Sequence, residues 1–173
     1  LHMKLLLVAI RTYGGNVMRL LILSTHYRAP VQFTDDTILS TKNSYERIEK
    51  AFIQLAIKIQ LLKGDINKKA NNMDNFLNAL ADDLNVSNAL TELFNVMKLA
   101  NQELRKNPVD LSKLEDIFAN YRDMLNILGL KIDYPLLTKE DEQIYNEYIE
   151  YKKEKNFAKS DELRNILIAR HII

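Results

Sequence analysis

Hydrophobic residues recur at alternating steps of three and four through most of the chain, the spacing that places them on one face of an α-helix. The longest such stripe predicts one helix that begins after a Thr34 cap and ends at Gly64. Its members are Tyr45, Ile48, Phe52, Leu55, Ile59 and Leu62. Similar stripes predict helices over 86–104 and 111–128, which stop before Pro108 and at Gly129 respectively.

Shorter patterns predict four more helices. Asn16 is a plausible cap for a very apolar helix that ends before Pro30, and a short helix is expected over 74–84. Thr138 begins another helix, and Asn156 caps the last one, over 157–170. Short connections between amphipathic helices force neighbours to run antiparallel. We therefore predict an all-α fold, an antiparallel up-and-down helix bundle preceded by a short helical linker segment.

The amino-acid composition is typical of a helical chain and excludes several kinds of functional site. Only four glycines and three prolines occur in 173 residues, too few for many strands joined by tight turns. The absence of cysteine excludes disulfides, cysteine-based zinc sites and a thiol nucleophile within the chain. The three histidines are scattered, so no metal site is expected. No segment approaches the roughly 20 apolar residues of a membrane span, so we expect a cytoplasmic protein without a membrane partner.

Charge is unevenly distributed along the chain. Residues 1–69 hold 11 Lys and Arg against 5 Asp and Glu, whereas residues 70–173 hold 13 against 18. A basic first part suggests a polyanionic partner. The alternative is a basic helix face that has no partner.

No arrangement of residues supports catalysis. The chain lacks a glycine-rich phosphate loop and the common hydrolase and metalloprotease motifs. Its acidic pairs, at 35–36, 82–83 and 115–116, are adjacent in sequence and point about 100° apart on a helix, so they cannot converge on one substrate. We predict no catalytic residues.

Two groups of basic and aromatic residues remain as candidate sites. The first is Arg19, His26, Tyr27 and Arg28, where guanidinium, imidazole and phenol groups suit phosphates and ribose hydroxyls. The second surrounds Phe157 within residues 150–164. Its members are Lys152, Lys153, Lys155, Lys159 and Arg164. A capped helix end and a solvated mixed-charge face, respectively, are the alternatives without RNA.

Three segments in order resemble one family. YGGNVMRLLILSTHYRAPVQFTDD (13–36) is similar to the segment that follows the catalytic domain of bacterial cysteinyl-tRNA synthetases. FLNALADDLNVSNALTELFNVM (76–97) and NFAKSDELRNILIARHII (156–173) resemble later parts of the same family. The Asp-Ala-Leu-Arg motif that names the family's helical domain stands here as Asp161-Glu162-Leu163-Arg164.

The resemblance implies a division of the chain and a partner. Residues 1–33 would be a stem-contact segment left from the end of the catalytic region, and residues 34–173 a helical-bundle domain that binds cysteine tRNA. It also implies that the two basic groups contact tRNA, although Arg164 has a structural alternative in an ion pair with Asp161 at i,i+3. The apolar helix Val17 to Leu23 would pack against the absent catalytic domain and leave a sticky exposed patch without it.

The parent enzyme's chemistry lies outside this chain. The parent joins cysteine to tRNA with ATP and Mg²⁺ and holds a zinc ion, but the HIGH and KMSKS signatures and the zinc ligands are absent here. We therefore expect a chain that is inactive alone and has no cofactor of its own. Two alternatives stay open, a fragment of a related ligase that joins cysteine to a sugar amine, and a helical protein-interaction module.

Overall fold

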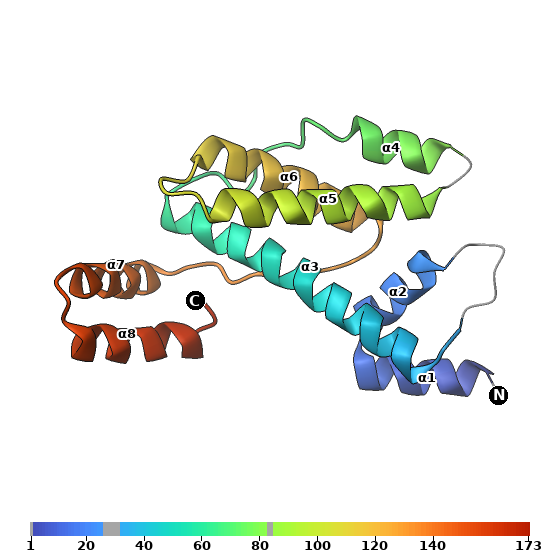
Figure 1. Ribbon diagram of the computed structural model, residues 1–173, viewed down its shortest axis with the longest axis horizontal. Coiled ribbons are helices and arrows are strands. Elements are labelled where there is room, and N and C mark those ends of the chain that lie inside the picture. The colour runs from blue at the N-terminus through green and yellow to red at the C-terminus, as the bar shows by residue number, and fades with distance from the viewer. Residues whose placement is uncertain (1, 26–31, 83–84) are drawn as a thin grey trace.

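The computed structural model describes residues 2–25, 32–82 and 85–173, and these residues form helices joined by turns and extended segments, with no strand among them (Figure 1). The described helices are α1 (His2–Tyr13), α2 (Gly15–Ser24), α3 (Asp35–Leu61), α4 (Asp74–Ala81), α5 (Val86–Leu104), α6 (Leu111–Ile127), α7 (Lys139–Lys153) and α8 (Phe157–Ala169). The predicted all-α class is confirmed.

Helices α3, α5 and α6 enclose the main hydrophobic core. The ring of Phe52 on α3 stacks on Phe118 of α6 with centroids 4.8 Å apart, and Tyr121 is fully buried beside them. Helix α4 covers α5, and helices that follow one another from α3 to α6 run in alternating directions (Figure 1). The predicted up-and-down order is thus confirmed in this part of the chain. The apolar stripes account for it, because their residues supply most of the core.

The last two helices form a hairpin that packs on the far end of α3 (Figure 1). A separate apolar cluster joins Ile57 of α3 to Leu167 of α8 and Ile172, and all three are buried. The chain reaches this hairpin through an extended segment, 130–138, whose first residue Leu130 is buried in the main core. The hairpin therefore rests on α3 through side chains of its own cluster.

The N-terminal helices differ from the sequence prediction in two ways. Helix α1 was not among the predicted elements, yet its apolar residues pack with Met18 and Leu21 of α2 and Ile38 of α3. The expected exposed patch on Val17 to Leu23 is wrong, because Val17, Met18, Leu20 and Leu21 are all buried. Helix α2, which we expected to pack against another domain, packs instead against α1 and α3 of this chain.

Several caps are confirmed and one is wrong. The side chains of Thr34, Thr138 and Asn156 each accept a hydrogen bond from a backbone N–H three residues on. Asn16, in contrast, lies inside α2, whose cap is Gly14 with φ +88°. The Asn16 amide instead donates to the Tyr45 hydroxyl at 2.9 Å and to the Lys131 carbonyl at 2.6 Å, which ties α2 to α3 and to the extended segment.

The glycine predicted to cap α3 donates its backbone N–H to the Ile59 carbonyl at 2.9 Å and so takes part in closing the helix. Lys63, not Gly64, adopts the left-handed conformation there, with φ +59°. A Cβ added at Gly64 would lie 2.7 Å from Leu111 Cδ1 and 2.8 Å from Glu115 Oε1, so a larger residue there would displace side chains of α6. The helix predicted over 74–84 ends at Ala81, and residues 83–84 lie outside the described part of the chain.

No single described helix is long and apolar enough to cross a membrane. Only the bent pair formed by residues 6–13 and 15–24, at 119°, reaches the required length and composition when joined.

Candidate nucleic-acid interface

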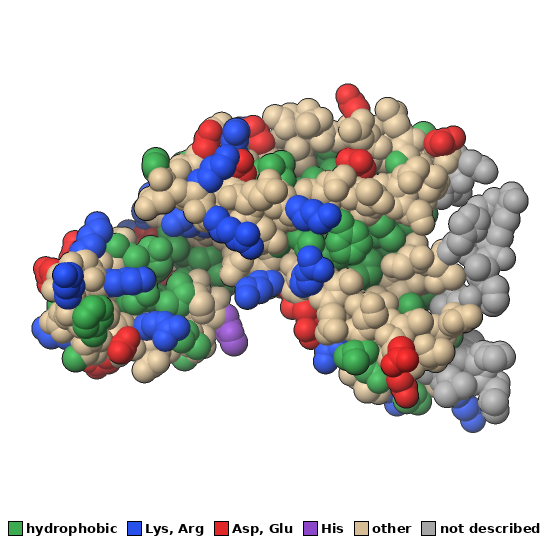
Figure 2. Space-filling model, viewed as in Figure 1, with side chains coloured by type: hydrophobic (Ala, Val, Ile, Leu, Met, Phe, Trp, Pro, Cys, Tyr) green, Lys and Arg blue, Asp and Glu red, His purple; other side chains and the backbone are tan. Residues whose placement is uncertain are grey.

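An open groove of about 910 Å³ lies beside the contact between α3 and the α7–α8 hairpin. One wall is α3 from Arg47 to Leu61, extended by the C-terminal end of α5 at Leu104 and Arg105. The other wall consists of Tyr145 on α7 and the chain end 171–173. In Figure 2, blue Lys and Arg side chains gather along the hollow between these two parts of the molecule.

The groove is strongly basic along α3. Arg47, Lys50 and Lys58 line it with Gln54, at steps of three, four and four, which is one face of the helix. Arg105, at the end of α5, adds a fourth permanent cation. Among the described residues none of these four cations forms an ion pair. Uncompensated cations in a concave surface attract an anionic ligand.

A single carboxylate side chain lines the groove with these cations. Glu49 lines the groove, and its Oε2 accepts a hydrogen bond of 2.8 Å from the Tyr45 hydroxyl. Burial raises the pKa of Tyr45 to about 12, so the phenol keeps its proton and remains a donor at neutral pH. Glu49 is thereby held towards Tyr45, and the positive charge of the groove is only partly reduced.

An ion pair stabilises the second wall. Asp141, at the start of α7, accepts a 2.6 Å hydrogen bond from Arg170, just after α8. The Thr138 backbone N–H and the Arg170 guanidinium hold the pKa of Asp141 below its ordinary value. Ile172, two residues beyond Arg170, is buried against Ile57. The chain end is therefore fixed where it lines the groove.

The structure brings four of the predicted lysines together. Lys152, Lys153, Lys155 and Lys159 are all exposed at the turn between α7 and α8, around a Phe157 ring that is 62% exposed. The Lys159 ammonium lies 5.0 Å from the centroid of the Tyr151 ring, a cation–π contact. This basic tip, defined by the four lysines and Phe157, is separate from the groove, which involves the other end of the hairpin.

Arg164 stands apart from the tip on α8. It is exposed, and among the described contacts it makes no ion pair with Asp161, so the structural alternative for this arginine finds no support. Its place on the solvent side of α8 leaves it free to contact a ligand.

The first predicted group is only partly described. His26, Tyr27 and Arg28 lie outside the described residues. Arg19 is exposed on α2, and a Cβ added at Gly129 would lie 2.6 Å from its Nη1. Gly129 follows α6, so the guanidinium lies against the C-terminal end of that helix, where positive charge is favourable. The structure therefore gives Arg19 a neighbour within the fold and does not bring it into the groove.

The groove cations were missed by sequence reasoning. Arg47, Lys50 and Lys58 lie beside the apolar stripe of α3, and a search of that helix for a second, basic periodicity would have found them. Arg105 has no such signal, because only the packing of α5 on α3 brings it to the same groove.

The described part of the chain contains no cluster of side chains that could bind a metal ion. No group of three or more His, Asp or Glu side chains there could hold a metal ion, and the sequence has no cysteine.

Comparison with known proteins places the chain beside one enzyme class. Residues 75–133, from α4 to the extended segment after α6, match the DALR domain family. A cysteine–tRNA ligase of Bacillus cereus (strain G9842) is 34% identical over 172 residues, which is 95% of this chain and 37% of that protein. Cysteine–tRNA ligases of Lachnoclostridium phytofermentans and Brevibacillus brevis are 31% and 30% identical, over 93% of this chain in each case.

These similarities cover nearly all of this chain but a minor part of each relative. The chain spans 37% of the length of the cysteine–tRNA ligases that it matches. The DALR match covers α4, α5 and α6, and α5 and α6 supply a large part of the main core. The resemblance to cysteinyl-tRNA synthetases is thereby confirmed: the chain is similar over 95% of its length to a part of cysteine–tRNA ligases. The DALR match is confined to residues 75–133 and does not reach the predicted motif at 161–164.

Proposed function

We propose that this chain is the tRNA-binding portion of a cysteine–tRNA ligase and that it positions cysteine tRNA for aminoacylation by a catalytic domain outside the chain. The observation that carries the proposal is the basic groove, with four cationic side chains and one carboxylate side chain along its walls. Sequence similarity supports the same proposal, because the relatives of this chain are cysteine–tRNA ligases.

The dimensions of the groove suit a nucleic-acid backbone. The cations from Arg47 to Lys58 extend over eleven residues of α3, about 16 Å at 1.5 Å per residue. That length runs alongside several nucleotides of one strand. Arginine binds phosphate through two parallel hydrogen bonds and lysine as a point charge, so a row of both fixes the position of a backbone without reading its sequence.

The basic tip would provide a second contact. Four exposed lysines attract phosphates, and the exposed Phe157 ring offers a surface on which an unpaired base can stack. Arg164, on the same hairpin, extends this surface along α8. Arg19, His26, Tyr27 and Arg28 remain candidate contacts of the linker segment, residues 1–33, with the bundle domain taken as residues 34–173.

In the whole enzyme, the catalytic residues would lie outside this chain. The catalytic domain would supply the ATP, Mg²⁺ and zinc sites, and this chain would contribute only position, so we propose that it is inactive alone. Holding two reactants in register accounts for several kcal/mol of a typical catalytic barrier, about 7 or more in favourable cases. A place in the cytoplasm, with the translation machinery, belongs to the same proposal.

Direct binding tests the proposal. Fluorescence anisotropy of labelled cysteine tRNA, titrated with the 173-residue chain, should show binding that weakens steeply as salt rises. An unrelated tRNA of equal length serves as the control. Weaker binding of the control supports recognition of cysteine tRNA, and equal binding reduces the role to general RNA docking. Failure to bind either RNA contradicts the proposal and favours the sugar-amine ligase or the protein-interaction module.

A further inference from the structure

A second concave site lies on the opposite side of α5 from the basic groove. It is a pocket of about 420 Å³ between α5, α6 and the loop that precedes α4. Leu99 and Glu103 of α5 line it, whereas the groove contains Asn101 and Arg105. Residues two apart on a helix point about 200° apart, so α5 separates the two sites. The family comparison assigns nothing to this pocket.

The pocket contains a buried acceptor without a partner. Glu103 is only 4% exposed, and its Oε1 accepts a 2.6 Å hydrogen bond from the Lys106 ammonium. Its Oε2 is buried and has no hydrogen-bond partner, the one such side-chain atom in the described part of the chain. An unsatisfied buried carboxylate oxygen costs stability unless a donor reaches it. The site therefore lacks an N–H or O–H donor at this position.

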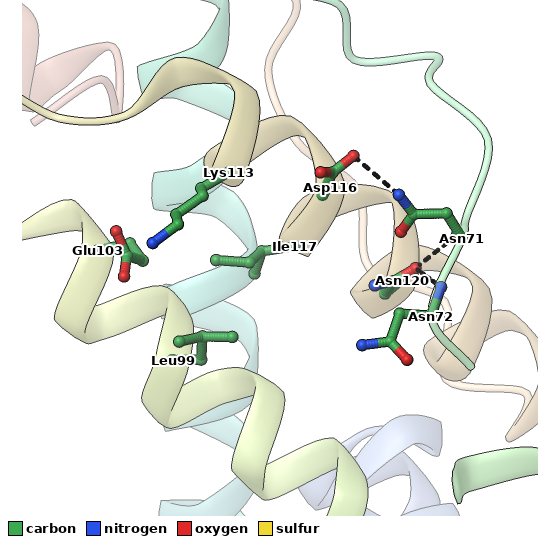
Figure 3. A pocket seen from close by; sticks show the side chains of 8 residues that line it. All are labelled: Asn71, Asn72, Leu99, Glu103, Lys113, Asp116, Ile117 and Asn120. Carbon is green, nitrogen blue, oxygen red and sulfur yellow. Dashed lines mark hydrogen bonds between the residues drawn. The ribbon is translucent and has the colours of Figure 1, made fainter. Parts of the chain in front are cut away.

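The far end of the pocket offers donors. Asn120 is 8% exposed, and its Oδ1 accepts the backbone N–H groups of Asn71 and Asn72 at 3.0 and 3.3 Å. Because the oxygen is occupied by the loop, the Asn120 side chain presents its NH₂ group to the pocket (Figure 3). The two asparagines of the loop are held in place by the same bonds.

An aliphatic floor lies between these polar ends. Figure 3 shows Leu99 and Ile117 between Glu103 on one side and Asn120 on the other. The lining is thus apolar in the middle, with Glu103 at one end and Asn120 at the other. Lys113 and Asp116 also line it, and the Asp116 carboxylate already pairs with Lys68 and accepts from Asn71. A flat heterocycle has the matching pattern, since its faces are apolar and its edges carry donors and acceptors.

We propose that this pocket binds a nucleobase with an exocyclic amino group, which donates to Glu103 Oε2 while a ring nitrogen or carbonyl of the base accepts from the Asn120 side chain. The aliphatic side chains of Leu99 and Ile117 contact the ring face. The base comes either from a free nucleoside or from an unpaired position in RNA, and the recognition chemistry is the same for both. The inference does not depend on the basic groove, because the two sites share no lining residue.

Lys113 offers the competing explanation. Its side chain points towards Glu103 in Figure 3, although among the described residues it forms no ion pair. If its ammonium satisfied Oε2 in solution, the pocket would be closed by the protein itself.

A matched pair of nucleosides tests the proposal. Adenosine and purine riboside differ only in the amino group, and saturation-transfer NMR with the full chain should give at least about tenfold weaker binding for purine riboside. Glu103→Gln should remove the difference, because Lys106 keeps the amide oxygen at the Oε1 position and leaves an NH₂ group where an acceptor is needed. Equal binding of the two nucleosides, or no binding of adenosine, overturns the proposal.

Two further measurements complete the test. If RNA is the source of the base, unpaired oligoadenylate should bind more tightly than adenosine. If the free nucleoside is the source, oligoadenylate should bind no more tightly. Glu103→Gln should weaken binding of both ligands. In a cycle of Lys113→Met and Glu103→Gln, the effects on thermal stability should add. Strong non-additivity would show that Lys113 pairs with Oε2 and would overturn the proposal.

Discussion

The Asp141 carboxylate on α7 and the Arg170 guanidinium just after α8 are joined by a 2.6 Å hydrogen bond between Oδ1 and Nη1. The same carboxylate accepts the Thr138 backbone N–H at 2.9 Å through Oδ2. One side chain therefore begins α7 and fixes the chain end that lines the basic groove. Glu142 adds a contact from α7 to Lys63 beyond α3, which connects the hairpin to the main bundle.

The stability of this hairpin should depend on pH through Asp141. The pKa of Asp141 is lowered in the folded state, so its stabilising contribution is complete above the unfolded pKa and is lost as pH falls through the folded value. Urea midpoints of the wild-type chain and of Asp141→Asn should therefore differ between pH 5 and 7 and converge below roughly pH 4. Asp161→Asn, on the exposed side of α8, is the matched control and should change the midpoint little at any pH. A difference that persists unchanged to pH 2 would show that charge at Asp141 is not the cause.

A second hydrogen bond anchors α6 to α3. The buried Tyr121 hydroxyl donates to the Ile48 carbonyl at 2.7 Å, and burial raises the pKa of the phenol. Tyr121→Phe should lower the free energy of unfolding by about 1 to 2 kcal/mol, because it removes the donor and leaves its space unfilled. Tyr134→Phe is the control. The Tyr134 ring also packs on Phe52, but its hydroxyl makes no hydrogen bond among the described contacts, so its loss should cost less than about 0.5 kcal/mol. Equal costs would mean that the Tyr121 bond contributes nothing.

Two glycines with positive φ allow backbone strain to be separated from crowding. Gly14 has φ +88° and no atom within 4 Å of the place where a Cβ would lie, whereas Gly129 has φ +72° and Arg19 Nη1 only 2.6 Å from that place. Alanine at either position should destabilise the chain by about 1 to 3 kcal/mol through strain. Only the Gly129→Ala variant should be partly rescued by Arg19→Ala, as measured by denaturant unfolding. Rescue of Gly14→Ala as well would contradict a local contact between Arg19 and Gly129.

The sequence predicts those features of the structure that depend on neighbouring residues, and it fails where a residue's role depends on partners far along the chain. The stripes of α3, α5 and α6 and the caps Thr34 and Thr138 are local patterns, and they are confirmed. The bounds of α5 and α6 agree to within a residue, whereas α3 ends at Leu61, before the predicted end at Gly64. Asn16 was misread, because its role comes from partners far along the chain, Tyr45 and Lys131. Tertiary contacts override local propensity at such positions.

The candidate site shows the same limit. The lysines of the basic tip are close in sequence, and the hairpin turn keeps them together as the pattern indicates. The groove joins α3, the end of α5 and the chain end, which only the fold brings together. The unpaired oxygen of Glu103 depends on burial, which no pattern of residue types along the chain reveals.

The basic tip should contribute to RNA affinity independently of the groove. Replacing Lys152, Lys153, Lys155 and Lys159 by alanine should weaken tRNA binding for every tRNA tested and lower the salt dependence, because each lost phosphate contact reduces the slope of log K against log salt by roughly one. Phe157→Leu, which keeps an apolar side chain but removes the ring, should weaken binding with little change of slope. An unchanged affinity in both variants would exclude the tip from the interface.

The most direct test of the central claim is the salt dependence of tRNA binding after removal of the groove charges. The variant carries Arg47→Ala, Lys50→Ala, Lys58→Ala and Arg105→Ala, and a control variant carries Lys98→Ala and Lys131→Ala, two exposed lysines outside the groove. Circular dichroism should show that both remain folded. The account predicts that the groove variant loses tenfold or more in affinity and shows a slope smaller by about three to four, while the control changes little. A groove variant that binds cysteine tRNA with the wild-type affinity and slope would contradict the account.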